Sequence, residues 1–251
     1  MKINDCFKEG KKALIVYISC GDPSVEETIK AADEIIAAGA DILELGLPFS
    51  DPIADGATIQ AASQRALEGG MNTDEYFDTV AKIMGVPKVC MTYYNLLFQY
   101  GLDRFCDRCV ESGISGLIIP DLSLEESAPL KAECDKRDID LIFIVTSRTN
   151  AERIKKISNE CSGFLYLQSL LGVTGERTLM ASNLKEAIAQ CKEISSMPVA
   201  VGFGVSNPKQ VKDLCSQGAD GVIVGSAVIK KMQNNRTGLS SFIRELKEAT
   251  L

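Results

Sequence analysis

The chain has 251 residues, of which 45% are hydrophobic and 24% are charged, a composition that indicates a folded globular protein and excludes a disordered or collagen-like chain. Its formal net charge of −7 opposes binding to nucleic acid or to an anionic membrane surface. The chain contains no histidine, which excludes Ser-His-Asp triads, histidine metal ligands and imidazole bases. Proton transfer therefore has to use other side chains, for which a pair of carboxylates in different environments is well suited.

The cysteines and the N-terminal segment indicate a reducing, non-membrane environment. Nine cysteines are an odd number, and the chain is far longer than a disulfide-stapled domain, so we expect free thiols in the cytoplasm. Cys106 and Cys109 form a C-x-x-C within a helical stretch, which we interpret as two apolar side chains on one helix face, with a metal or redox site as the alternative. The N-terminus lacks a signal-peptide core, and the apolar run 13–18 is too short to cross a bilayer.

Short apolar runs alternate with amphipathic helical stretches along the chain. The runs are rich in β-branched residues and lack a polar-apolar alternation, as is typical of parallel strands buried on both faces. The expected strands are 13–18, 41–45, 88–93, 115–119, 140–145, 163–167, 198–201 and 220–224.

Eight strand-helix units favour an α/β fold of the (β/α)8 TIM-barrel type, formed as a single domain over residues 1–251, because a doubly wound sheet typically has fewer strands. The segments GADILELG, GISGLIIPD and GADGVIVGS repeat one pattern of glycine, turn and buried strand. Ser24 is placed to cap the first helix, and Gly39, Gly113 and Gly218 are placed to end helices in a left-handed conformation.

Two carboxylates follow the second expected strand. Glu44 interrupts an apolar run, so its side chain either faces the barrel mouth or is a partner in a buried ion pair. Asp55 lies on the long loop that follows, although Asp before Gly is also a turn signal ahead of a helix that we expect near Thr58. Because catalytic side chains of barrels lie at the carboxyl ends of strands, both residues are candidates.

Glycine-bearing turns after the seventh and eighth strands predict a phosphate site. Gly204 and Gly225 bring bare backbone N–H groups close to an anion at helix starts, and Ser226 adds a hydroxyl donor. The Gly-x-Gly at 202–204 is not a dinucleotide fingerprint, because Asn207-Pro208 indicates a helix cap instead. Ordinary turn chemistry is the alternative. The loop 168–180 is long enough to be a lid over a substrate, and Tyr166 ends the strand before it.

At these positions the sequence resembles the tryptophan synthase alpha chain family, and the resemblance spans nearly the whole chain. The order and spacing of the matching motifs are far more specific than the barrel pattern alone. The motifs are CGDP at 20–23, LELGLPFSDPIADGATIQ at 43–60, MTYYN at 91–95, PDL at 120–122, GVTG at 172–175, GFGVS at 202–206 and VGSAVIK at 224–230.

The resemblance implies a lyase that splits indole-3-glycerol phosphate into indole and glyceraldehyde 3-phosphate. It implies that Glu44 is the acid/base residue, that Asp55 binds the indole N–H, and that Tyr166 orients the glutamate. By the same resemblance Thr174 contacts the carboxylate loop from the lid. The implied phosphate ligands are Gly175, Phe203, Gly204, Gly225 and Ser226, and the implied walls of the indole pocket are Tyr17, Ile59, Met91 and Tyr93.

The resemblance also implies a partner, the beta chain, which carries pyridoxal phosphate and forms an αββα tetramer with a chain that has no cofactor of its own. The implied partner contacts are Pro48, Asp51, Pro52, Asn95 and, on the lid, Gly172. Two features depart from the family pattern. Leu170 and Leu171 replace the usual lid residues, and only twelve residues precede the first strand, so we expect a reduced plug at the barrel bottom.

Three other functions stay open at this point. The chain could be a lyase that works alone, or a non-catalytic activator of the beta chain. It could also be a different phosphosugar aldolase or isomerase. A Schiff-base aldolase would need a lysine at the barrel mouth, and Lys88, the one lysine within an expected strand, lies at the opposite end.

Overall fold

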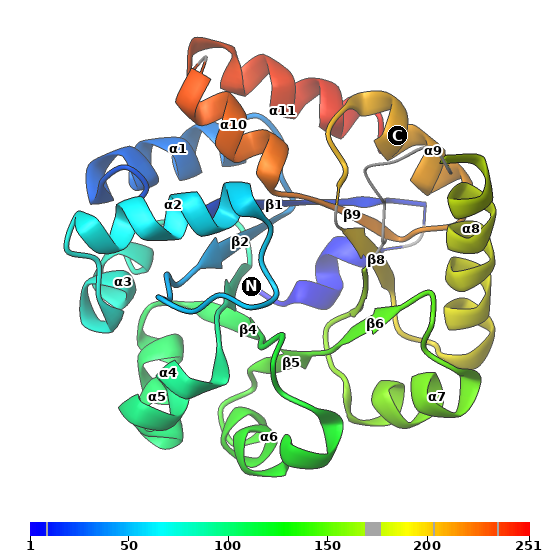
Figure 1. Cartoon of the computed structure of the whole chain (residues 1–251), viewed down its shortest axis with the longest axis horizontal. Coiled ribbons are helices and arrows are strands. Elements are labelled where there is room, and N and C mark those ends of the chain that lie inside the picture. The colour runs from blue at the N-terminus through cyan, green and yellow to red at the C-terminus, as the bar shows by residue number, and fades with distance from the viewer. Residues whose placement is uncertain (9, 169–176, 203, 235) are drawn as a thin grey trace.

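The computed structural model describes residues 1–8, 10–168, 177–202, 204–234 and 236–251, with 177–183 described by backbone alone. Its strands are all parallel and neighbour one another in the order β5-β4-β3-β2-β1-β9-β8-β7-β6, with helices around the outside (Figure 1). The strands are β1 (Ala13–Ser19), β2 (Ile42–Gly46), β3 (Lys88–Met91), β4 (Ile114–Ile118), β5 (Asp140–Ile142), β6 (Ile144–Thr146), β7 (Leu165–Gln168), β8 (Val199–Gly202) and β9 (Gly221–Val224).

The strand expected at 140–145 is divided into β5 and β6 at Phe143. The first half pairs with β4 and the second half with β7, while the Phe143 carbonyl accepts a hydrogen bond from the Tyr166 N–H at 3.0 Å. The chain itself therefore closes the ring at this point. Counting β5 and β6 as one, the eight expected strands form the predicted TIM barrel.

Helices cover the outer face of the barrel and begin and end where the sequence signals them. Ser24 accepts a hydrogen bond from the Glu27 N–H at 3.3 Å, and Asn207 accepts one from the Gln210 N–H at 3.0 Å. The described helices are α1 (Val25–Ala37), α2 (Ala57–Glu68), α3 (Thr73–Val80), α4 (Tyr94–Tyr100), α5 (Leu102–Glu111), α6 (Ala128–Asp135), α7 (Ala151–Glu160), α8 (Arg177–Ile194), α9 (Pro208–Ser216), α10 (Ser226–Asn234) and α11 (Leu239–Glu248). Gly39, Gly113 and Gly218 have the expected positive φ angles of 108°, 73° and 104°.

Successive residues of each strand point alternately into the barrel and toward the helices. In β2, Ile42 belongs to the interior cluster, whereas Leu43 and Leu45 pack in the layer between strands and helices. Both faces are buried, which explains why the strands read as continuous apolar runs. The same alternation turns Glu44 toward the barrel interior.

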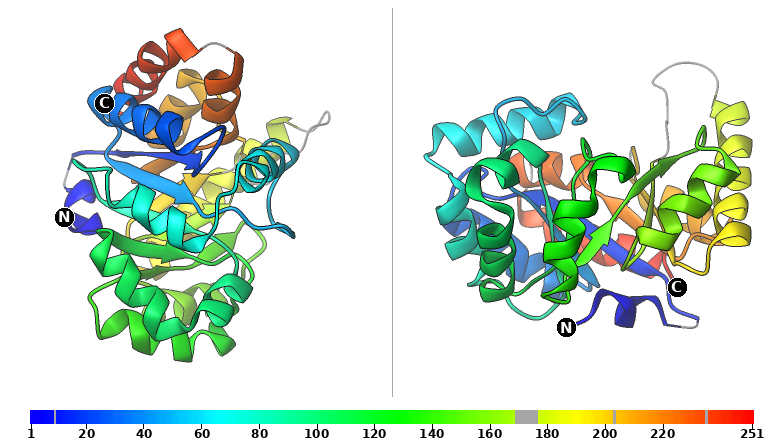
Figure 2. Two further views of the ribbon diagram at one scale, coloured as in Figure 1. Left: turned by 90° about the vertical axis from the view of Figure 1, so that its left-hand side faces the viewer. Right: turned by 90° about the horizontal axis from the view of Figure 1, so that it is seen from below.

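The N-terminal segment closes one end of the barrel. Its short 3-10 helix, Ile3–Phe7, places the fully buried Ile3 in the interior cluster and the Phe7 ring 5.6 Å from the Phe164 ring. Figure 2 shows this segment at one end and α2, with the loop before it, at the other. The short N-terminal segment that the sequence predicts at the bottom of the barrel is thus a 3-10 helix of five residues.

Cys106 and Cys109 are both fully buried on α5 as free thiols, in agreement with their interpretation as apolar side chains. Lys88 is the first residue of β3, at the end of the barrel away from the carboxyl ends of the strands, where its ammonium donates to the carbonyls of Val80, Ile83 and Ser112. None of the helices in the described part of the chain is long and apolar enough to cross a membrane.

Candidate active site

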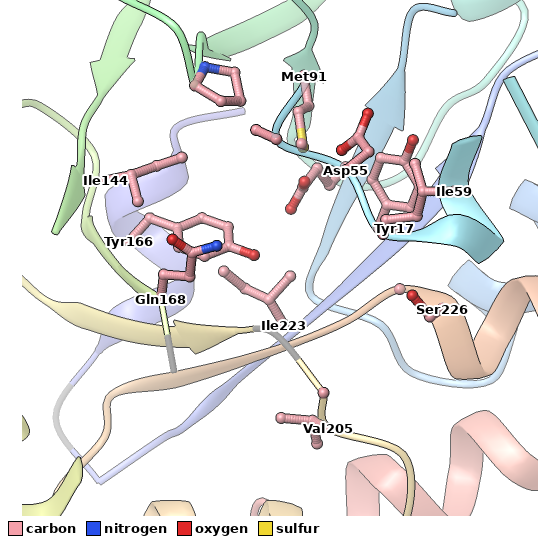
Figure 3. A pocket seen from close by; sticks show the side chains of 16 residues that line it. Tyr17, Asp55, Ile59, Met91, Ile144, Tyr166, Gln168, Val205, Ile223 and Ser226 are labelled. Atoms are coloured by element: carbon pink, nitrogen blue, oxygen red, sulfur yellow. The ribbon is translucent and has the colours of Figure 1, made fainter. Parts of the chain in front are cut away.

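A cavity of about 270 Å³ opens at the carboxyl ends of the strands and collects most of the described candidate residues. In Figure 3, Tyr17 and Ile59 lie beside Asp55 on one side, and Ile144, Tyr166 and Gln168 lie on the other. The lining residues are Tyr17, Glu44, Ala54, Asp55, Gly56, Ile59, Met91, Pro120, Ile144, Tyr166, Gln168, Gly204, Val205, Ile223, Gly225 and Ser226.

Glu44 is buried at the floor of this cavity. Its side chain is 1% exposed, and its Oε2 has no hydrogen-bond partner among the described residues. Burial raises the pKa of the Glu44 carboxyl to about 8, and the negative charge of Asp55 adds to the shift. No lysine or arginine contributes to this pKa, so the alternative of a buried ion pair is excluded within the described chain. Glu44 is therefore protonated at neutral pH and faces the cavity.

Asp55 reaches the same cavity from the loop between β2 and α2. Its backbone forms the expected turn, since its N–H donates to the Pro52 carbonyl at 3.2 Å, and α2 begins two residues later at Ala57. The carboxyl Oδ1 is buried and has no hydrogen-bond partner in the part of the chain that the structure describes. Burial raises the pKa of Asp55 to about 6, and a hydrogen bond from the Tyr93 hydroxyl opposes the shift. The turn therefore does not prevent the Asp55 side chain from lining the cavity.

Tyr93 lies behind the cavity wall. Its hydroxyl accepts a hydrogen bond from the Ala54 N–H at 3.0 Å, which leaves its proton for Asp55. Its ring packs against Phe49 with the ring centroids 5.4 Å apart. Tyr93 is not among the lining residues, in contrast to Tyr17, Ile59 and Met91, so the structure places it as a support for the Asp55 loop.

Two glycines that the sequence reasoning missed create the space for the tyrosines of the cavity. A Cβ atom on Gly46 would lie 2.2 Å from the Tyr17 hydroxyl, and one on Gly202 would lie 2.4 Å from the Tyr166 hydroxyl. Each phenol therefore crosses directly over the backbone of the neighbouring strand. Each glycine also ends its strand, and that position is the signal that could have identified it.

The predicted phosphate loops lie on the β8 and β9 side. Gly204, with φ of 82°, lines the cavity together with Gly225 and Ser226. Because Ser226 is the first residue of α10, the N-terminal end of this helix is at this edge of the cavity. The remaining candidates Gly172, Thr174, Gly175 and Phe203 lie outside the described residues, as do Leu170 and Leu171.

The implied partner contacts differ in accessibility. Asp51 and Asn95 are exposed and Pro52 is half-buried, whereas Pro48 is buried and cannot present much surface to a partner. Two apolar side chains that the sequence reasoning missed are exposed on the same face, Ile53 at 82% and Phe98 at 65%. They lie after β2 and β3, which are neighbouring strands.

No group of three or more cysteine, aspartate or glutamate side chains in the described ranges is arranged to hold a metal ion. The described residues bring two carboxyls with raised pKa values into one cavity with the glycine-bearing turns that follow β8 and β9.

Comparisons with known proteins agree on one family. The sequence profile of the tryptophan synthase alpha chain family matches residues 3–250. The tryptophan synthase alpha chain of Methanosarcina acetivorans is 47% identical, over 100% of this chain and 94% of its own. Tryptophan synthase subunit alpha from Legionella pneumophila superposes with a TM-score of 0.90 at 32% identity, over 100% of this chain and 98% of that one. A structure of Mycobacterium tuberculosis tryptophan synthase also gives 0.90, at 34% identity over 99% and 96%.

Proposed function

The chain belongs to the tryptophan synthase alpha chain family, and we propose that it cleaves indole-3-glycerol phosphate to indole and glyceraldehyde 3-phosphate. The observation that carries this proposal is the pair of buried carboxyls in one cavity, with pKa values of about 8 for Glu44 and about 6 for Asp55. At pH 7 the pair supplies one acid and one negative charge, which are the two groups that a retro-aldol cleavage of an indole requires.

In the proposed reaction the Glu44 carboxyl gives its proton to indole C3. The ring nitrogen then carries positive charge, which the Asp55 carboxylate offsets through a hydrogen bond from the N–H. The Glu44 carboxylate next accepts the proton of the hydroxyl on the adjacent carbon. The bond between that carbon and C3 breaks, its electron pair returns to the ring, and indole and an aldehyde form. Glu44 ends protonated, as it began.

The other residues of the cavity hold the substrate and the acid in place. Tyr166 crosses the barrel interior. We propose that its buried hydroxyl orients the Glu44 carboxyl. Gly204, Gly225 and Ser226 hold the phosphate through backbone N–H groups and a hydroxyl, so that an acidic chain can bind a dianion locally. The apolar walls around Ile59, Met91 and Ile144 exclude water from the indole ring.

We further propose that the chain acts with a tryptophan synthase beta chain, which contains pyridoxal phosphate and takes up the indole in an αββα tetramer. The supporting observation is the exposed face around the cavity, where Asp51, Asn95, Ile53 and Phe98 are accessible.

The test is indole release from indole-3-glycerol phosphate by the purified chain, with and without a tryptophan synthase beta chain. We expect slow release by the chain alone and a large increase when the partner is added. A rate that is already fast and does not respond to the partner would support a lyase that works alone. No release in either condition would contradict the lyase and favour a non-catalytic activator.

A further inference from the structure

Gln168 is a polar side chain of the cavity for which neither the sequence nor the proposed mechanism supplies a role. It is the last residue of β7, two positions after Tyr166, so both side chains face the barrel interior. Its strand neighbours are Gly202 on β8, whose missing side chain leaves room for the Tyr166 phenol, and Thr146 on β6. Figure 3 shows the amide next to the Tyr166 ring and directed into the cavity.

The Gln168 amide has no hydrogen-bond partner within the described ranges of the chain. The cavity that it lines also contains the apolar side chains of Ile144 and Ile223 and the Tyr166 ring. An amide offers two N–H donors and a carbonyl acceptor. When a ligand displaces water from the cavity, binding becomes less favourable unless the ligand forms hydrogen bonds with these groups. A ligand hydroxyl, which is both donor and acceptor, satisfies an amide best.

The position of Gln168 around the barrel selects one hydroxyl of the proposed substrate. The phosphate loops follow β8 and β9, and the Glu44 carboxyl lies across the interior on β2. β7 is the strand next to β8, so the amide lies on the wall beside the phosphate site, across the cavity from Glu44. In the proposed complex the three-carbon glycerol chain lies between the phosphate site and Glu44. The hydroxyl next to the indole is needed by Glu44, which leaves the middle hydroxyl of the chain for Gln168.

We propose that Gln168 is a specificity-determining residue that hydrogen-bonds the middle hydroxyl of the glycerol chain. This inference rests on the proposed function. It makes the site selective for a hydroxylated three-carbon chain over an unsubstituted one, because binding of the latter displaces water and leaves the amide unpaired.

The test compares two ligands on Gln168→Met, a substitution that keeps the side-chain length and removes the hydrogen-bonding groups. The first ligand is indole-3-glycerol phosphate, measured by kcat/KM for indole release. The second is 3-(indol-3-yl)propyl phosphate, which keeps the indole and the phosphate and lacks both hydroxyls, measured by its inhibition constant. Gln64→Leu, at an exposed glutamine of α2 that donates to Glu68, is the matched control.

We expect kcat/KM of Gln168→Met to fall about fivefold to tenfold, which is the effect of losing one neutral hydrogen bond. The inhibition constant of the propyl phosphate should stay within about twofold of the wild-type value, or improve, because the unpaired amide is gone. Equal weakening of both ligands would overturn the proposal, since it would indicate a contact with the phosphate or a structural defect. Unchanged kcat/KM would also overturn it. Failure of the wild-type chain to release indole would instead contradict the proposed function.

Discussion

The Asp55 carboxylate lies close enough to the buried Glu44 carboxyl for its charge to help keep the Glu44 proton in place. The two groups come from a strand and from the loop that follows it, and each has one buried oxygen without a partner among the described residues. Their pKa values, about 8 and about 6, separate their roles near neutral pH. Several properties of the protein depend on this pair.

The pH dependence of kcat/KM should be bell-shaped. Activity requires Asp55 to be ionised, so it rises with pH through about 6, and it requires Glu44 to be protonated, so it falls through about 8. The measurement is kcat/KM for indole release between about pH 5 and about pH 9.5, a range that covers both limbs of the profile. A plateau that continues above pH 9 would contradict the role of Glu44 as the acid.

Glu44→Gln should stabilise the fold increasingly as the pH rises. The folded chain holds the Glu44 proton up to a pKa of about 8, against an ordinary value of 4.5, so the folded state binds more protons than the unfolded state between these values. The wild type therefore loses stability as the pH rises through this window, and the glutamine variant does not. The difference in unfolding free energy should grow by at most about 5 kcal/mol.

Urea unfolding at pH 5, pH 7 and pH 9 measures this difference. Glu68→Gln, at an exposed glutamate of α2, serves as the control and should show no such trend. A difference for Glu44→Gln that is independent of pH would mean that the Glu44 proton is not held by the fold.

Gly202→Ala should damage both the fold and the site. The added Cβ would lie 2.4 Å from the Tyr166 hydroxyl, so the phenol has to move out of its position across β8. We expect a loss of about 1 to 3 kcal/mol in unfolding free energy, as for overpacking of a core, together with a lower kcat. Gly56→Ala, whose Cβ would meet no atom within 4 Å, is the control for stability and should change it little. Equal stability of the two variants would show that β8 tolerates the side chain.

Ser226→Ala should weaken phosphate binding with a smaller effect on kcat. The hydroxyl is at the first residue of α10 and lines the cavity, where it donates to a charged acceptor in the proposed complex. Loss of such a bond costs about 1 to 3 kcal/mol. The change is measured as the affinity for glycerol 3-phosphate and as KM for the substrate. An unchanged affinity would place the phosphate elsewhere.

The sequence predicted the parts of this molecule that depend on local patterns. Runs of β-branched residues located all eight strands. Glu44 could be recognised as a candidate because burying a carboxylate within an apolar strand costs free energy. The break at Phe143 could not be predicted, because it arises when one strand pairs with two neighbours that are distant in the chain. The support from Tyr93 likewise depends on a contact between distant segments, which a single sequence does not reveal. Gly46 and Gly202 could have been noted as strand ends, but the tyrosine that each one accommodates is known only from the structure.

The measurement that tests the central claim most directly is indole release by Glu44→Gln, assayed beside the wild-type chain with the beta chain present. The variant keeps the size of the side chain and removes the proton that the mechanism transfers. We expect a loss of more than about 100-fold in kcat, with the affinity for 3-(indol-3-yl)propyl phosphate preserved. If Glu44→Gln releases indole at the wild-type rate while it binds this ligand normally, Glu44 is not the acid, and the proposed mechanism is wrong.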